Sequence, residues 1–312
     1  MEDRDVVITS AFRTAIGSFN GSLSSKTGPE LGSTVIKKCV EHSELKPEEV
    51  DTTYMGQVLT TGAGQNPARQ ASILAGLSND TTNITINQVC GSGLASVGLA
   101  YNSIKSGDGK VIIAGGQESM SNSPHYINIR KGIKMGDGSM KDSMIIDGLW
   151  DAYNQYHMGI TAENVAEKFQ IRREEQDSFA AASQRKAAEA IKANKFVNEI
   201  VPVKVKVKKE EVEFNQDEYP KANSTVEKLA KLRPAFKKDG TVTAGNASGV
   251  NDGAAALCLM TGEMAKKKDI EPLAKIVSWA QCGVDPSIMG TGPIPASKLA
   301  SKKAGWGEDE LD

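Results

Sequence analysis

The sequence predicts an α/β protein with a mainly parallel or mixed sheet. Hydrophobic residues make up 39% of the 312 residues and charged residues 24%, which is typical of a globular chain rather than a disordered one. This length suggests two domains or one large layered unit. Strand and helix patterns alternate along the first 120 residues, and that order favours helices packed on a central sheet.

The elements expected in this first part are short apolar strands and amphipathic helices. Pro29 opens a helix whose apolar side chains Leu31, Val35, Cys39 and Val40 recur near the helical period. A second helix is expected over 93–104. Strands are expected over 6–9, 83–89 and 111–114, the last ending at Gly115-Gly116.

The remaining chain mixes loops, helices and strands. Residues 128–147 lack periodicity and are long for a loop, which is typical of functional or interface segments. Apolar spacing predicts a helix over 161–169, and a composition rich in Ala, Glu and Lys predicts another over 173–193, while 295–303 resembles a short helix. Strict alternation predicts a strand over 201–207, and the apolar segments 254–260 and 273–279 resemble strands, with a turn-rich loop over 241–253. Acidic residues over 307–312 are typical of a first helical turn, so we expect the polypeptide to be incomplete at its C-terminus.

Charge and cysteine content exclude several classes of protein. With 37 basic and 39 acidic residues the net charge is −2, which gives no general attraction to nucleic acid or to an anionic membrane. No apolar run approaches the ~18 residues of a membrane-spanning helix, and the acidic N-terminus is unlike a targeting peptide. Four cysteines without a C-x-x-C pair, and three histidines, argue against structural zinc and for reduced thiols in the cytoplasm.

The sharpest chemical feature is the segment from Ile86 to Ser96, in which a strand ends at Cys90 and an apolar helix begins after Gly91-Ser92-Gly93. A thiol at a helix N-terminus lies beside the positive end of the helix dipole, which favours the nucleophilic thiolate. Small neighbours let a substrate approach the sulfur and the local backbone N–H groups. Those donors would stabilise an oxyanion formed by attack on a carbonyl.

Two other interpretations of this segment remain open on the residues alone. Cys90 in a glycine-rich turn is also consistent with a buried structural cysteine. The spacing Gly91-x-Gly93-x-x-Ser96 approaches the dinucleotide-binding fingerprint. That second interpretation is weaker, because the preceding strand is polar and no acidic residue ends the next strand to hold a ribose.

The segment over 86–93 resembles the acyl-enzyme segment of thiolases, specifically of the biosynthetic acetoacetyl-CoA thiolases. Further segments resemble the same family in family order: 13–19, 64–71, 115–121, 156–159, 161–164, 232–236 and 243–255. Several segments in order are more specific than one glycine-rich turn. The resemblance therefore favours a nucleophilic Cys90 over a structural one.

The resemblance implies a Claisen condensation of two acetyl-CoA molecules to acetoacetyl-CoA and CoA, and the reverse thiolysis, through an acetylated Cys90. It assigns the backbone N–H of Cys90 to an oxyanion hole. It places His157 and Ser248 along a pantetheine channel, with Leu149, Met158, Phe236 and Ala244 as apolar walls. Coenzyme A would be part of the substrate, and no separate cofactor or metal is expected.

The sequence departs from the family at two places. Lys221 stands where members often have an arginine near the adenine and phosphates of CoA. A lysine keeps the charge but not the planar guanidinium. The family's downstream Asn-Glu-Ala-Phe, Gly-His-Pro and Cys-x-Gly-Gly-Gly segments, which supply an asparagine, an oxyanion-hole histidine and an acid/base cysteine, do not occur in the 312 residues. We therefore expect this chain alone to be inactive.

The fold implied is a five-layered αβαβα arrangement of two βαβαβαββ halves, the second mostly missing. The N-terminal half would comprise residues 1–121 and 249–270, a loop domain residues 122–248, and the start of the C-terminal half residues 271–312. The family assembles as homodimers or homotetramers, and the irregular segment 123–148 would suit a tetramer contact. No nucleic-acid or membrane partner is implied.

Three other functions remain as alternatives. A 3-ketoacyl-CoA thiolase of broader chain length would share these segments, and Met158 favours short acyl chains instead. A non-catalytic thiolase-like CoA- or lipid-binding protein would have no need of Cys90. A condensing enzyme that uses acyl-carrier protein would lack the paired segments around His157 and Ser248.

Overall fold

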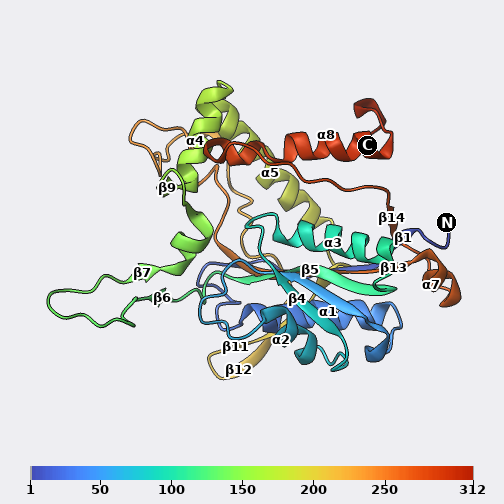
Figure 1. The fold of residues 1–312 in the computed structure, drawn as a ribbon. Coiled ribbons are helices and arrows are strands. Elements are labelled where there is room, and N and C mark those ends of the chain that lie inside the picture. The colour runs from blue at the N-terminus through green and yellow to red at the C-terminus, as the bar shows by residue number, and fades with distance from the viewer. Residues whose placement is uncertain (1, 312) are drawn as a thin grey trace. The chain divides into compact units, whose positions relative to one another are not determined.

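The computed structural model describes residues 2–311, and its contacts divide the chain into two compact units. The first comprises Met1–Gly148, Glu199–Glu218 and Asn251–Val277, and the second comprises Leu149–Asn198, Tyr219–Val250 and Ser278–Asp312. Figure 1 shows the elements of both units by their labels and colours.

An eight-stranded mixed sheet organises the first unit. Its main strand order is β10-β1-β13-β5-β3-β4, while β14 pairs with β1 and β2 pairs with β13. The strands are β1 (Val6–Thr14), β2 (Gly17–Ser18), β3 (Thr52–Gly56), β4 (Thr82–Ile86), β5 (Val111–Ser119), β10 (Ile200–Val201), β13 (Asn251–Thr261) and β14 (Ala274–Ile276). Strand β5 runs parallel to β3, which runs parallel to β4, whereas β13 runs antiparallel to both β1 and β5. The predicted mixed α/β sheet is confirmed.

Helices cover both faces of this sheet, with α3 (Ser92–Ser106) on one face and α1 (Gly28–His42) with α2 (Pro67–Leu74) on the other (Figure 1). Successive strand residues point to opposite faces. Val7, Ile113 and Cys258 therefore pack on the α1 side. Their neighbours Val6, Ile112 and Leu259 pack on the α3 side with Ala100 and Ile104.

Helix α1 begins where its sequence provides the cap. The Thr27 hydroxyl accepts the Glu30 N–H, the Glu30 carboxylate accepts the Thr27 N–H, and Pro29 lies in the first turn. The predicted apolar side chains Leu31, Val35, Cys39 and Val40 are all buried. The sequence-based helix is confirmed together with the face that it buries.

The prediction that a strand ends at Gly115-Gly116 is wrong, because β5 continues to Ser119. Gly115 and Gly116 pair with Ala256 and Ala255 of β13. A side chain at Gly115 would collide with the Ala255 carbonyl oxygen. The glycines thus mark a close approach of two backbones inside the sheet, not the end of a strand.

Smaller elements complete the first unit. They are the 3₁₀ turn η1 (Pro47–Glu49), helix α7 (Gly262–Lys267), the pair β6 (His125–Tyr126) and β7 (Lys141–Asp142), and the hairpin β11 (Val203–Val207) with β12 (Glu210–Phe214). In the hairpin Val203 and Val205 are buried, while Lys204 and Lys206 are exposed, as the alternation predicts. The π-helical turn η2 (Met144–Leu149) ends at the residue where the second unit begins.

The second unit is mainly helical. It contains α4 (Met158–Lys168), α5 (Arg173–Lys192), α6 (Val226–Leu229), α8 (Pro293–Ala304), the paired strands β8 (Trp150–Asp151) and β9 (Tyr156–His157), and the 3₁₀ turns η3 (Pro286–Thr291) and η4 (Glu308–Glu310). The sequence predicts α4, α5 and α8 to within three residues at each end. Among the described residues, no helix is long and apolar enough to cross a membrane.

Candidate active site

The segment between β4 and α3 holds Cys90 in a tight turn. The Gly91 N–H donates to the Gln88 carbonyl (3.0 Å), and the Ser92 N–H donates to the Val89 carbonyl (3.1 Å). The Ser92 side chain fastens the turn, because its hydroxyl accepts the Gln88 N–H (2.9 Å) and donates to the Val89 carbonyl (2.6 Å). Cys90 is exposed, at the start of α3, whose first turn has no side-chain cap. Its thiol is accessible to a ligand at the positive end of a helix.

The backbone immediately before Cys90 is strained. Val89 has φ 49°, and a β-branched residue in this left-handed region is a genuine outlier. The Asn87 side chain accepts the Val89 N–H (2.9 Å), which helps to hold that conformation. Strain of this kind persists only where the surroundings fix it, and it is concentrated at functional sites.

Glycines bring the start of α3 close to the sheet. A Cβ at Gly56 of β3 would lie 2.7 Å from backbone and side-chain atoms of Ser92, and 2.8 Å from the Gly93 nitrogen. One turn later, the Ser96 hydroxyl donates to the Gly115 carbonyl of β5 (2.7 Å). The turn that carries Cys90 is therefore fixed against β3 and β5 by contacts that larger side chains would prevent.

A partly buried carboxylate lies near the end of β5. The Glu118 carboxylate accepts the backbone N–H groups of Val58 (2.8 Å) and Leu59 (3.1 Å). Burial raises the pKa of Glu118 above its ordinary value, and the two N–H donors oppose that rise. Glu118 therefore fixes the chain that follows β3, next to the sheet edge formed by β4.

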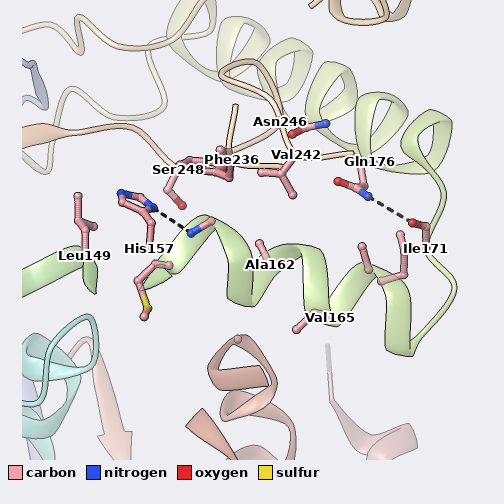
Figure 2. A pocket seen from close by; sticks show the side chains of 15 residues that line it. Leu149, His157, Ala162, Val165, Ile171, Gln176, Phe236, Val242, Asn246 and Ser248 are labelled. Atoms are coloured by element: carbon pink, nitrogen blue, oxygen red, sulfur yellow. Dashed lines mark hydrogen bonds between the residues drawn. The ribbon is translucent and has the colours of Figure 1, made fainter. Parts of the chain in front are cut away.

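The second unit contains a cavity of about 420 Å³ beside α4 (Figure 2). Its lining is mostly apolar and comes from α4 and the residues just before and after it, from the start of α5, from the ends of η2 and η3 and from two loop segments. The lining residues are Leu149, His157, Met158, Gly159, Ala162, Val165, Ala166, Ile171, Gln176, Phe236, Val242, Asn246, Ala247, Ser248 and Gly290. An apolar cavity with a few convergent polar groups is typical of a small-molecule site.

His157 is held in one orientation at the N-terminus of α4. Its Nδ1 accepts the Gly159 N–H (3.0 Å), so the ring caps the helix, and its other nitrogen is the one that carries the proton in the neutral form (Figure 2). Burial lowers the pKa of His157, which favours that neutral form. The ring therefore offers an Nε2–H donor to a ligand.

Phe236 stacks on His157, with ring centroids 4.8 Å apart and planes inclined by 18°. Its ring also lies against Gly159, where any Cβ would collide with it. Only glycine fits at position 159, because the aromatic ring occupies the place of a side chain.

The cavity brings together five of the seven residues predicted to bind CoA: Leu149, His157, Met158, Phe236 and Ser248. Two others do not line it. Ala244 is exposed, and the Lys221 N–H donates to the Gln184 side chain (2.8 Å) on α5. The roles of all seven remain predictions.

The sequence reasoning did not identify Gln176, Asn246 and Ala247 as lining residues, nor the two buried acids Glu163 and Asp177 behind them. Glu163 lies within a segment that the family resemblance covers, but its burial has no sequence signal. An acidic residue on a helix is ordinarily exposed.

No cluster of three or more His, Cys, Asp or Glu side chains in the described residues has the arrangement of a metal site. The four cysteines are free thiols, and Cys39 and Cys258 are buried in the core of the first unit.

Comparison with known proteins gives matches over nearly the whole chain. The model of the thiolase N-terminal domain matches residues 6–263, and that of the thiolase C-terminal domain matches residues 270–312. Because both domains match, the expectation that most of the second half is missing, and that the chain is inactive for that reason, is not supported.

The chain is 56% identical over 312 residues to the acetyl-CoA acetyltransferase of Rhizobium meliloti. This match covers 100% of this chain and 79% of the relative. It is 56% identical over 306 residues to the acetyl-CoA acetyltransferase of Paracoccus denitrificans, covering 98% and 78%. The crystal structure of the Bacillus anthracis acetyl-CoA acetyltransferase aligns with a TM-score of 0.96 at 42% identity, over 99% of this chain and 78% of that one. The fold and these matches together establish that the chain belongs to the thiolase family.

Proposed function

We propose that this protein is an acetyl-CoA C-acetyltransferase, which joins the acetyl groups of two acetyl-CoA molecules and also catalyses the reverse thiolysis. The observation that carries the proposal is the exposed Cys90 thiol on a strained turn at the start of α3, in a chain 56% identical to relatives of that name. A protein that only binds CoA or lipid would have no reason to keep an accessible thiol there. The activity of those relatives also favours a short acyl chain.

The first step is acyl transfer to the protein. The Cys90 thiolate attacks the thioester carbonyl of acetyl-CoA, the new C–S bond forms, and the bond to the CoA sulfur breaks. CoA leaves as a thiolate and takes up a proton. Backbone N–H groups at the start of α3, that of Cys90 among them, would stabilise the oxyanion of the tetrahedral intermediate.

The second step forms the carbon–carbon bond. A second acetyl-CoA loses an α-proton to a base, and its carbanion attacks the carbonyl of acetyl-Cys90. The C–S bond breaks, acetoacetyl-CoA is released, and Cys90 returns to the thiolate. The family's acid/base segments are not among the described residues, so no residue of this chain is assigned to the base.

The cavity of the second unit is proposed to take the pantetheine arm. Its apolar lining suits a flexible chain with few charges, and His157 Nε2–H and the Ser248 hydroxyl supply polar contacts to the arm's amides. Met158 and Leu149 would contribute apolar walls. Ala244 and Lys221 are proposed to lie further along the same ligand, Lys221 near its phosphates.

Organisation and assembly follow the family expectation as proposals. We assign residues 1–121 with 249–270 to an N-terminal half, 122–248 to a loop domain and 271–312 to the C-terminal half. A homodimer or homotetramer is proposed, because the loop after β6 exposes the apolar side chains of Ile127, Ile129, Ile133, Met135 and Met140. Four free thiols are consistent with a cytoplasmic location.

The proposal is tested by acetylating the protein with acetyl-CoA and following the adduct by intact-protein mass spectrometry. The wild type should acquire one acetyl group on Cys90. Cys90→Ser should lower both adduct formation and acetoacetyl-CoA thiolysis by at least about a thousandfold, because a hydroxyl without an activating base is a far weaker nucleophile.

Cys282→Ser is the matched control, since Cys282 is a partly exposed thiol outside the proposed site. It should react like the wild type. Acetylation that persists in Cys90→Ser, or that maps to Cys282, would disprove the proposed role of Cys90.

A further inference from the structure

One wall of the cavity is a loop rather than a helix. Within the segment 240–248, Val242, Asn246, Ala247 and Ser248 all line the cavity. In the structure this segment is irregular, with a turn over 244–246 and an isolated bridge between Thr243 and Pro234. Its position therefore depends on the side chains that hold it.

Glu163 of α4 holds the first part of this wall. Its carboxylate accepts the Thr241 N–H (2.8 and 2.9 Å to the two oxygens), the Thr241 hydroxyl (3.0 Å) and the Val242 N–H (2.8 Å). Glu163 is only 5% exposed, and a Cβ at Gly240 would collide with its carboxylate. Position 240 thus requires glycine so that the loop can lie directly on the carboxylate.

Asp177 of α5 holds the second part. Its carboxylate accepts the Asn246 amide (2.9 Å) and Arg173 Nε (2.7 Å), and it is 1% exposed. The Asn246 side chain closes the loop on itself, because its oxygen accepts the Thr243 N–H (2.7 Å) and its amide also donates to the Thr241 carbonyl (3.1 Å).

Two carboxylates from different helices therefore converge on one short loop. Burying a carboxylate is costly unless it accepts several hydrogen bonds, so each acid strongly favours the loop conformation that supplies its donors. In the described part of the chain, the residues lining the cavity do not include either acid. Their effect on a ligand must pass through the loop.

We propose that Glu163 and Asp177 are positioning residues, which fix the segment 240–248 as a wall for the pantetheine arm of acyl-CoA. This inference rests on the proposed function, because it takes the cavity to be the acyl-CoA site. It adds that affinity for the substrate depends on two acids that do not touch it, whereas the chemistry at Cys90 does not depend on them.

Glu163→Gln is the main test. It leaves the size of the side chain nearly unchanged but places an NH₂ group against backbone donors. We expect the Kd for CoA, measured by calorimetry, and the KM for acetyl-CoA in the acetylation of Cys90 to rise about tenfold, while the rate at saturation stays within about twofold. Asp177→Asn should act in the same direction.

Glu167→Gln is the matched control, because Glu167 lies one turn along α4 with its side chain 78% exposed, and among the described residues that side chain makes only a long ion pair with Lys237 (3.7 Å). It should change neither constant by more than about twofold. Thr241→Val removes one donor to Glu163, and it also removes the acceptor of the side-chain amide of Gln176 (2.8 Å), which lines the cavity. It should raise the Kd by a few-fold. If Glu163→Gln does not fold, a larger rise in Thr241→Val than in Gln176→Leu, which loses the same contact to Thr241, assigns the effect to Glu163.

The outcomes separate the two proposals. A wild type that does not bind CoA would overturn the proposed site and this inference with it. Normal binding by the wild type, with an unchanged Kd in folded Glu163→Gln or Thr241→Val, would overturn the positioning role alone. A fall in the saturated acetylation rate with unchanged KM would also contradict it.

Discussion

Cysteine is exposed in one region of the first unit and buried in another. Cys90 lies on an exposed turn, whereas Cys39 and Cys258 lie in the core. Cys39 faces inward from α1 and Cys258 inward from β13, and both are fully buried. The Cys39 thiol donates to the Ala256 carbonyl (3.2 Å). Cys90 lies instead on an exposed turn, next to a residue in an unfavourable backbone conformation.

The difference shows what makes a cysteine functional in this fold. Burial raises the pKa of Cys39 to about 12, chiefly because the thiolate would lose its hydration, and it raises the pKa of Cys258 for the same reason. These thiols behave as small apolar side chains. Reactivity requires the opposite arrangement, in which the chain leaves the sheet and exposes the sulfur at a helix N-terminus.

Thiol labelling should give the largest contrast between the two regions. At pH 8 a pKa of about 12 instead of the ordinary 9.0 reduces the thiolate fraction of Cys39 by about a thousandfold, before its burial is considered. In folded protein treated briefly with iodoacetamide, we expect Cys90 to be alkylated at least about a thousandfold faster than Cys39 or Cys258. Peptide mapping measures the rates.

The same experiment in urea is the control, because unfolding should bring the rates at all sites close together. The raised pKa of Cys39 also makes the stability of the folded state depend on pH. A thiol whose folded pKa is raised stabilises the folded state below its unfolded pKa of about 9, and that contribution is lost as the pH rises toward 12. Faster labelling of Cys39 or Cys258 than of Cys90 in folded protein would contradict the comparison.

A second way to test the contrast is to disturb the support of the turn. Gly56→Ala places a Cβ 2.7 Å from Ser92 atoms and 2.8 Å from the Gly93 nitrogen, which are backbone or near-backbone atoms that cannot rotate away. We expect the unfolding free energy to fall by about 1–3 kcal/mol. Acetylation of Cys90 should also slow, because the start of α3 must shift. Urea titration and the acetylation assay measure the two effects.

Gly283→Ala is the matched control, since a Cβ there meets nothing within 4 Å and the backbone is not in the left-handed region. It should leave both quantities unchanged. If Gly56→Ala were as mild as Gly283→Ala, the close packing of α3 on β3 would not be what supports the turn.

The two regions also differ in how far the sequence predicts them. The inward face of α1 follows from the spacing of Leu31, Val35 and Cys39, and its start follows from Thr27 and Glu30, because periodicity and capping are local signals. The start of α3 after Cys90 is also predicted by local signals. The continuation of β5 through Gly115-Gly116 is not predicted by local signals, since it depends on pairing with β13 more than 130 residues away.

The site is likewise predicted only where its residues have local or family signals. Cys90, His157 and Ser248 lie in such segments, and the structure brings His157 and Ser248 to one cavity. The burial of Glu163 and Asp177 depends on tertiary contacts, and the left-handed φ of Val89 is one that a β-branched residue does not signal. Composition and periodicity do not distinguish Glu163 and Asp177 from acidic residues on the exposed face of a helix. They likewise do not distinguish Val89 from an ordinary valine in a strand.

The strain at Val89 gives the smallest but most specific test of the contrast. Val89→Asn places a residue that tolerates φ 49° where a β-branched one does not. The hydrogen bonds to Asn87 and Ser92 use the Val89 backbone and survive the change, and the valine side chain is already 41% exposed. We therefore expect the unfolding free energy to rise by about 1 kcal/mol.

Val197→Asn is the matched control, because Val197 is 61% exposed and has an ordinary φ, so it should change stability little.

In Val89→Asn, a relaxed turn should keep its thiol accessible but hold it less rigidly, so Cys90 should alkylate as before while its acetylation by acetyl-CoA slows by a few-fold. If Val89→Asn is no more stable than Val197→Asn, the turn is not strained in solution. If it is more stable and acetylates at the wild-type rate, the strain is real but serves no purpose in the chemistry. A more stable variant that acetylates more slowly would mean that the turn gives up stability to hold the sulfur in place, which the core around Cys39 and Cys258 has no need to do.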